Sequence, residues 1–182
     1  MRHDTLIMTT IGAVLLGASA LSWSDDDRRW GGRGGADIHP PTDATYLAEC
    51  GSCHQAYPPG LLPGRSWGRL LAGLDDHFGD NAELAPETLT RIATYLAANA
   101  AERGDGWIAE RIAATVPAQA TPLRISELGY IQRKHDELPA GLVQGNPQVG
   151  SLGNCIACHR GADQGMFDEH RVEIPGQGRW GD

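Results

Sequence analysis

Cys50-Gly51-Ser52-Cys53-His54 and Cys155-Ile156-Ala157-Cys158-His159 are two copies of one pattern, in which a histidine directly follows the second of two cysteines. The two copies contain all four cysteines of the 182-residue chain and two of its seven histidines. Closely spaced cysteines bind metals, form disulfides, carry out redox chemistry or attach covalent groups. The surrounding sequence indicates which of these uses applies.

Three of the four uses are not favoured. A redox Cys-x-x-Cys motif normally follows a strand in an alternating strand–helix pattern, which surrounds neither copy. A zinc site of four thiolates has about 15 to 20 residues between its cysteine pairs, and the gap here is about five times longer. Disulfides are the first suspicion for an exported chain, and they stay open as an alternative together with zinc. The histidine that ends both copies instead favours covalent attachment of c-type haem.

The Cys-x-x-Cys-His pattern suits haem for a stereochemical reason. Two cysteines three positions apart on one helical turn can form thioethers with the two vinyl groups of the porphyrin, and the next residue then places its imidazole under the iron. The sequence therefore predicts two covalently bound haem c groups. Their attachment and ligand residues are Cys50, Cys53 and His54 for the first haem, and Cys155, Cys158 and His159 for the second.

A second axial ligand for each iron must come from elsewhere in the chain. Beyond the N-terminal segment the only methionine is Met166, so two methionine-ligated haems are impossible. The remaining histidines in that part of the chain are His39, His77, His135 and His170. We expect His77 and His135 to be the ligands and His39 and His170 to be solvated surface residues. If either expected ligand is wrong, His39, His170 and Met166 are the next candidates.

His77 and His135 are favoured because each shares a helical face with apolar residues. The expected N-caps and helix ends are Ser66 and Gly79 for the first helix, and Ser126 and Pro139 for the second. The simplest pairing is His54 with His77 and His159 with His135, because each pair is close in sequence. Crossed pairing stays open.

The predicted fold class is mainly α, with two small haem-binding modules, each built around one haem, and little β structure. Helices are expected to begin at Thr42 or Asp43, to cover 85–102 after Pro86 enters the first turn, and to cover 106–117. No segment shows sustained period-two alternation, so strands should be few. The expected division is 1–24 as signal or anchor, 25–41 as flexible acidic and glycine-rich tether, 42–104 as first module and 105–182 as second module.

The N-terminus resembles an export signal. Arg2 precedes a mostly apolar run from Leu6 to Leu21, and Ala18-Ser19-Ala20 offers the small residues that a signal peptidase accepts. The run is at the short end for a bilayer span. We therefore expect a cleaved signal and a periplasmic protein, and the alternative is a segment retained as an anchor in the inner membrane, which would give membrane contact.

The formal net charge of −8 limits the partners. Nothing basic is clustered enough to displace phosphate counterions, so nucleic acid is excluded. A redox partner is expected to present a basic docking face to this acidic chain.

Four blocks of the sequence resemble the bacterial dihaem cytochrome c family, small periplasmic proteins with two haems. They are ECGSCHQAYPPGLLPGRSW (49–67), GLDDHFGDNAEL (73–84), TPLRISELGYIQRKHDE (121–137) and NCIACHRGADQGMFDE (154–169). The resemblance covers roughly residues 42–175. It implies two low-spin haems ligated by His54, His77, His135 and His159, low reduction potentials, and electron delivery to a redox partner. In this family the partners include an oxygen-binding monohaem cytochrome, with a membrane b-type cytochrome as a plausible electron source.

The sequence thus predicts an electron carrier and not an enzyme. Two six-coordinate irons would leave no position for a substrate, so electron transfer would be outer-sphere. Two alternatives stay open: an electron-transfer subunit of a membrane respiratory or photosynthetic complex, and a small haem peroxidase or reductase with one open iron. Carbon monoxide binding to the ferrous protein would favour the enzyme.

Overall fold

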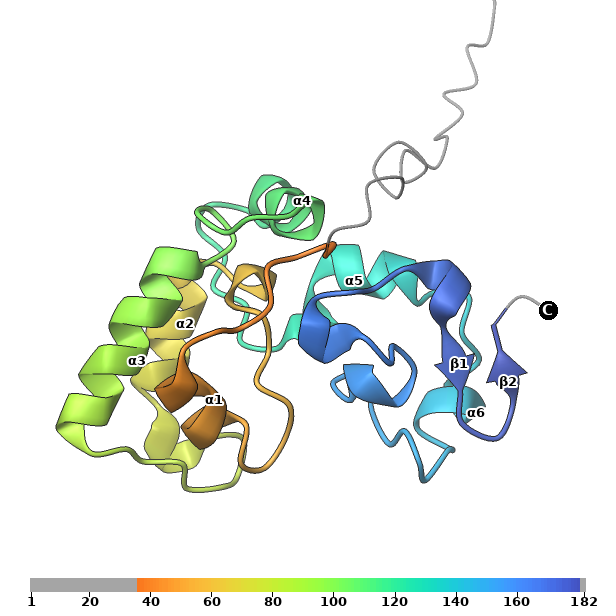
Figure 1. The fold of residues 1–182 in the computed structure, drawn as a ribbon, viewed down its shortest axis with the longest axis horizontal. Coiled ribbons are helices and arrows are strands. Elements are labelled where there is room, and N and C mark those ends of the chain that lie inside the picture. The colour runs from red at the N-terminus through yellow and green to blue at the C-terminus, as the bar shows by residue number, and fades with distance from the viewer. Residues whose placement is uncertain (1–35, 181–182) are drawn as a thin grey trace, which may run out of the picture.

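A computed structural model describes residues 36–180 of the chain. The expected signal or anchor at 1–24 and the first part of the tether lie outside the described residues. Within them the protein is divided into two halves, with helices α1, α2 and α3 in one half and α5, α6 and the only two strands of the described part in the other (Figure 1). No described helix is both long and apolar enough to cross a bilayer.

The first half is built from three helices. They are α1 (Ala44–Cys50), α2 (Gly64–Leu71) and α3 (Pro86–Asn99), with 3₁₀ turns η2 (Pro59–Leu61) and η3 (Leu74–Asp76) between them. Pro86 is at the start of α3, and Ile92 and Leu96 are buried on one of its faces, as the sequence predicts. The adjacent faces of α2 and α3 pack against each other, and α1 packs on α3.

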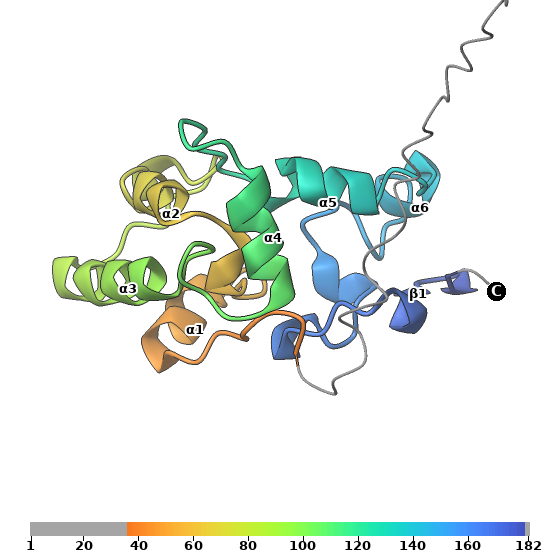
Figure 2. The same ribbon diagram turned by 90° about the horizontal axis from the view of Figure 1, so that it is seen from above.

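Helix α4 (Trp107–Thr115) lies between the halves, as the view from above shows (Figure 2). It packs on η2 of the first half and on α5 of the second. Ile108 and Ile112 point into the core, and Pro117 follows soon after the last helical residue, in agreement with the predicted helix. The hydrophobic core is therefore continuous across the expected module boundary at residue 104.

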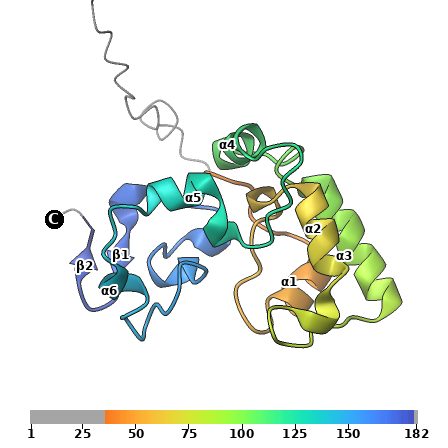
Figure 3. The ribbon, with the colours of Figure 1, turned by 180° about the vertical axis from the view of Figure 1, so that it is seen from behind.

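The second half has shorter and less regular elements, seen from behind in Figure 3. Its helices are α5 (Gly129–Lys134) and α6 (Ala140–Val143), and its 3₁₀ turns are η4 (Ile125–Glu127), η5 (Cys155–Ala157), η6 (Ala162–Gln164) and η7 (Glu169–Arg171). Strands β1 (Glu173–Ile174) and β2 (Gly178–Arg179) form one antiparallel ribbon, with Glu173 paired to Arg179. The prediction of a mainly helical protein with little β structure is confirmed.

The segment just before α1 is part of the folded core, which differs from the tether expected over 25–41. Ile38 is fully buried, and the backbone N–H of Asp37 donates to the carbonyl of Gly165 at 2.8 Å. The N–H of Ile108 in turn donates to the carbonyl of Asp37 at 3.2 Å. An apolar side chain in a polar segment thus fixes residues 36–41 between the halves, because its burial offsets the cost of ordering the chain.

The helices predicted to carry His77 and His135 are shorter than expected. α2 ends at Leu71, and Gly73 leaves the helical region with φ −131° and ψ 33°, so His77 follows the separate turn η3. Helix α5 ends one residue before His135. Neither predicted serine is an N-cap: Pro63 precedes α2, Leu128 precedes α5, and Ser66 is buried inside α2, its hydroxyl without a partner among residues 36–180.

Candidate functional site

The first Cys-x-x-Cys-His copy lies at the end of α1 and in the turn that follows. Asp43 begins this helix, because its side chain accepts hydrogen bonds from two backbone N–H groups of the first turn at 2.9 and 3.0 Å. Cys50 is the last helical residue, and Cys53 and His54 follow it in an exposed turn. One helix end thus positions both cysteines and the histidine, as the sequence predicts.

His77 faces His54 across this first site. Its backbone N–H donates to the carbonyl of Asp80 at 2.7 Å, which holds the tight turn after η3, and Phe78 in that turn has the uncommon φ of 59°. The ring centroids of His54 and His77 are 6.3 Å apart, with only 23° between the ring planes. The turn, rather than a continuous helix, therefore presents His77 to the first motif.

The second copy lies on η5 and the residues after it. The N–H of His159 donates to the carbonyl of Cys155 at 2.8 Å, which closes one helical turn around the motif. His135 comes directly after α5, and its ring centroid is 6.1 Å from that of His159, with the planes at 77°. The structure therefore brings together the histidines of the simplest predicted pairing.

Two of these four rings have a fixed orientation. His54 Nδ1 is 2.7 Å from the carbonyl oxygen of Gln55, and His135 Nδ1 is 2.7 Å from that of Ile131. A carbonyl oxygen can only accept, so Nδ1 carries a proton in both rings, and Nε2 is the nitrogen left to bind a metal. Histidines that ligate metals commonly donate their other ring N–H to such a partner.

The spacing of the two histidine pairs fits an iron bound between each of them. With metal–nitrogen bonds of about 2 Å on either side, two imidazoles on opposite faces of one iron have ring centres about 6 Å apart. The observed 6.3 and 6.1 Å agree with this value. Large apolar side chains are also exposed beside the sites, where a porphyrin could cover them: Phe78 is 45 % exposed and Ile156 44 %. The residues present therefore fit two haems.

The electrostatic surroundings favour neutral imidazoles. Burial, with a smaller contribution from the neighbouring His54, lowers the pKa of His77 below its usual value. Burial also lowers the pKa of His159 to about 4, with His135 acting in the same direction and Asp37 against it. Only a neutral imidazole can donate a lone pair to a metal, so these two rings are suited to that role.

The thiols are not prepared for a thiolate metal site. Burial raises the pKa of Cys50 and of Cys155 to about 11, and it also raises the pKa of Cys158. None of the four cysteines forms a disulfide, and the described part of the chain has no group of three or more His, Cys, Asp or Glu residues able to hold a metal ion. The structure thus does not support the disulfide and zinc alternatives.

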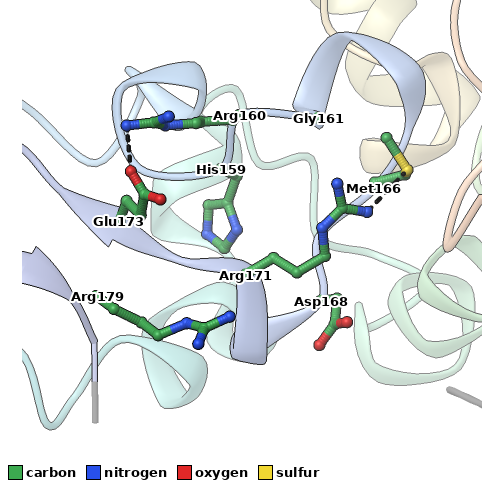
Figure 4. Close-up of a pocket in the computed structure, with 8 residues that line it drawn as sticks. All are labelled: His159, Arg160, Gly161, Met166, Asp168, Arg171, Glu173 and Arg179. Atoms are coloured by element: carbon green, nitrogen blue, oxygen red, sulfur yellow. Dashed lines mark hydrogen bonds and ion pairs between the residues drawn. The ribbon is translucent and has the colours of Figure 1, made fainter. Parts of the chain in front are cut away.

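The other candidate ligands, His39, His170 and Met166, are placed differently from the two histidine pairs. His39 and His170 are exposed. Met166 lines a cavity of about 170 Å³ beside His159, but its sulfur accepts a hydrogen bond from Arg171 at 3.5 Å (Figure 4). The cavity has a polar rim in which Arg160 pairs with Glu173.

Three residues that the sequence did not single out lie close to the sites. The carboxylate of Asp37 accepts from Trp107 Nε1 at 3.0 Å and from the backbone N–H of Phe167 at 2.6 Å, and the ring of Phe167 lies 5.4 Å from that of His159. Asp37 thus ties the segment just before α1 to the second site. Asp37 and Phe167 are 130 positions apart in the sequence, so no local sequence pattern could have indicated their contact.

The other two residues contact the first site. The guanidinium of Arg124 lies 3.9 Å from the centre of the Phe78 ring, beside His77. The ring of Tyr57 lies 5.2 Å from that of His54, and its hydroxyl donates to the carbonyl oxygen of Gly153 at 2.7 Å. Both residues belong to sequence blocks that resemble the family, yet neither type of side chain indicates a haem site by itself.

Comparison with known proteins agrees with this geometry. The sequence model of the dihaem cytochrome c family matches residues 46–167. A diheme cytochrome type c from Shewanella baltica is 46 % identical, with a TM-score of 0.63, and the alignment covers 77 % of this chain and 98 % of the other. A diheme cytochrome c from Rhodobacter sphaeroides is 42 % identical, also with a TM-score of 0.63, over 71 % of this chain and 99 % of the other. No curated protein matches the chain.

The matched residues contain both Cys-x-x-Cys-His motifs and both histidine pairs. The family carries two c-type haems, and its members are electron carriers rather than enzymes. The two motifs and the family match thus agree on cofactor and chemistry, and the chain belongs to the dihaem cytochrome c family.

Proposed function

We propose that each haem is held between two histidines, His54 with His77 and His159 with His135, and that the protein passes single electrons between redox proteins. The observation that carries this proposal is the pair of ring separations, 6.3 and 6.1 Å, each joining a motif histidine to one other histidine. The bound haem supplies a one-electron iron couple, whose potential depends on its axial ligands and surroundings.

The protein residues provide binding and orientation in this function. The cysteines would hold the porphyrin by thioethers, and the histidines would ligate the iron, which would leave no position at the metal for a reactant. The carbonyl oxygens of Gln55 and Ile131 orient two of the four rings. No residue transfers a proton or forms a bond with a substrate, which distinguishes this function from the peroxidase or reductase alternative.

Electron paramagnetic resonance of the oxidised protein at low temperature tests the ligation. Two low-spin species are expected, and they should differ, because the rings are 23° apart at the first site and 77° apart at the second. Nearly parallel imidazoles give a rhombic signal, whereas nearly perpendicular ones give a strongly anisotropic signal. A high-spin signal, or carbon monoxide binding to the native ferrous protein, would contradict the proposal and favour an enzyme.

The proposed location is the periplasm. It is supported by the signal-like segment at 1–24, and c-type haems are attached outside the cytoplasm in bacteria. Mass spectrometry of the N-terminus of the native protein tests it. A chain that begins near residue 24 would indicate a free carrier, and a chain that retains the segment would favour an anchored protein or a subunit of a membrane complex.

The proposed partners are a donor such as a membrane b-type cytochrome or a quinol-linked complex, and an acceptor protein with a basic face, such as an oxygen-binding monohaem cytochrome. The net charge of −8 supports the basic face, because opposite charges steer association. Association should slow as salt rises above about 0.1 M, where exposed charges are screened. A rate constant independent of ionic strength would contradict this part of the proposal.

A further inference from the structure

Tyr57 lies between the two candidate haem sites and contacts both. Its ring centroid is 5.2 Å from that of His54, and the two ring planes are 32° apart. Its hydroxyl donates to the carbonyl oxygen of Gly153 at 2.7 Å, across 96 positions of sequence. One side chain of the first half thus reaches the residue that lies two positions before Cys155 of the second motif.

The contact continues beyond the hydroxyl into the second motif. The carbonyl oxygen of Gly153 is 3.6 Å from Cys155 Sγ, which is a weak hydrogen bond for a thiol and a close contact for the same sulfur in a thioether. A short chain of contacts therefore joins the two sites: the ring of His54, the ring of Tyr57, the carbonyl of Gly153 and the sulfur of Cys155.

Tyr57 is held in place by its surroundings. Its backbone carbonyl accepts a hydrogen bond at 2.8 Å from the hydroxyl of Tyr46, a residue with only 1 % of its surface exposed. The neighbours on either side, Ala56 and Pro58, are buried, while Tyr57 itself is half-buried. Its position is therefore fixed by the core of the first half, and not by a mobile surface loop.

We propose that Tyr57 is a positioning residue that sets the spacing of the two haem sites and provides the contact route by which an electron passes between them. This inference rests on the proposed function. In each transfer one electron leaves one iron and reduces the other, so one site is oxidised and the other reduced. No bond forms or breaks, no proton moves, and the tyrosine stays unoxidised.

The substitution Tyr57→Phe tests the hydrogen bond in the complete two-haem protein. Loss of one neutral hydrogen bond should make local opening around Gly153 roughly two- to tenfold more frequent, which hydrogen exchange at the amides of residues 153–155 measures. Electron exchange between the two sites, measured by NMR exchange spectroscopy on half-reduced protein, should slow several-fold. Tyr57→Leu, which also removes the ring, should slow it further.

Tyr95→Phe is the matched control. The Tyr95 hydroxyl accepts a hydrogen bond of 2.9 Å from the N–H of Thr42, and its ring packs against Tyr46 inside the first half. This variant also loses one tyrosine hydroxyl, but at a position without a contact to the second motif. Its inter-site exchange rate and its amide protection at residues 153–155 should equal those of the wild type.

Each outcome has a defined meaning. If Tyr57→Phe leaves both the protection and the exchange rate at wild-type values, the inference is overturned. If Tyr57→Leu does not fold, Tyr57→Phe alone decides, because it keeps the ring. If both tyrosine-to-phenylalanine variants slow exchange equally, the effect is a general loss of stability and the inference also fails. Failure of the proposed function would look different, since wild-type protein itself would then bind carbon monoxide or lack a low-spin iron.

Discussion

The two sites have nearly the same ring separation but different ring angles and different supports. The separations of 6.3 and 6.1 Å agree with the spacing expected for two imidazoles bound to one iron. The angles between the ring planes differ widely, at 23° and 77°. The first site is held by a helix end and a three-helix core, and the second by 3₁₀ turns and loops. On the proposed ligation the iron would set the distance, whereas the local backbone sets the rotation of the rings.

The local causes of the two angles can be named. At the first site, the ring of His54 contacts that of Tyr57, 5.2 Å away and tilted by 32°, and it lies 6.3 Å from that of His77. At the second site, the bond from His135 Nδ1 to the carbonyl of Ile131 fixes one ring, and Phe167 packs against the other. Since ring orientation affects the electronic structure of the iron, the two sites should be distinguishable in spectra.

The largest effect is expected when His77 or His135, the histidine of each pair that lies outside the Cys-x-x-Cys-His motif, is removed. His77→Ala should convert only the first haem to high spin, and His135→Ala only the second, because on the proposed ligation each iron would lose one of its two axial ligands. Each change should raise the affected potential on the order of 100 mV, within the range of roughly 0.8 V that axial ligation spans. Visible spectroscopy with and without carbon monoxide, together with redox titration, measures both effects.

These variants also test the pairing. If His77→Ala or His135→Ala leaves both irons low-spin, the replaced histidine is not the ligand and another residue must be. Met166, beside His159, would then be the next residue to replace. If one variant changes both haems, the two sites are not independent. A change in the reduction potential of the haem that keeps both histidines would measure how strongly the two sites are coupled.

The second test compares the cores that support the two sites. Ile92 is fully buried in α3, so Ile92→Ala should lower the free energy of unfolding by about 2–5 kcal/mol. Val149 in the second half is 6 % exposed, and Val149→Ala removes only two methyl groups, so about 1–3 kcal/mol is expected there. Urea unfolding followed by circular dichroism measures both. Equal losses would mean that the irregular half is packed as well as the helical one.

The third test concerns the charge of Arg124 at the first site. The Arg124 guanidinium over Phe78 is a positive charge near His77, so it should favour the reduced state of the adjacent iron. Arg124→Gln should therefore lower the first potential, on the order of 10 mV because the side chain is exposed and Glu127 lies 3.7 Å away. The second potential should not move. Spectroelectrochemical titration resolves the two, and equal shifts of both potentials would rule out a local effect.

The smallest test addresses the helix that carries the first motif. Hydrogen bonds from the N–H of Tyr46 and from Arg91 lower the pKa of Asp43 below its usual value, so its negative charge stabilises the folded state. This contribution is complete above the unfolded pKa and is lost as pH falls through the lowered folded pKa. Asp43→Asn should therefore be slightly less stable than wild type at neutral pH, and the difference should shrink in acid. Urea unfolding at both pH values measures it, and a difference that grows in acid would reverse the assigned sign.

Local signals in the sequence predicted much of the fold and of the haem sites. The cap Asp43, the entry of Pro86 into α3 and the short helix before Pro117 all depend on neighbouring residues, and all agree with the structure. The approach of His77 to His54 and of His135 to His159 was also predicted, because few histidines were available.

The remaining features depend on contacts between distant parts of the chain. The predicted helix through His77 breaks at Gly73, although its apolar spacing continues, because the chain turns to present the ring. The bonds from Tyr57 to Gly153 and from Phe167 to Asp37 join residues 96 and 130 positions apart. Neither periodicity nor capping carries information about such pairs, so one sequence alone does not indicate them.

Residues 36–41, just before α1, affect where a stable form of this protein can begin. Gly106, with φ of 108°, passes so close to this segment that a Cβ there would lie 2.6 Å from the carbonyl oxygen of Asp37. A Cβ at Gly165 would likewise meet the carbonyl oxygen of Ile38. The family match starts only at Tyr46. A protein that began at Tyr46 would lack residues 36–41, which both glycines accommodate. Its two halves should separate more readily under mild heating than those of the longer chain.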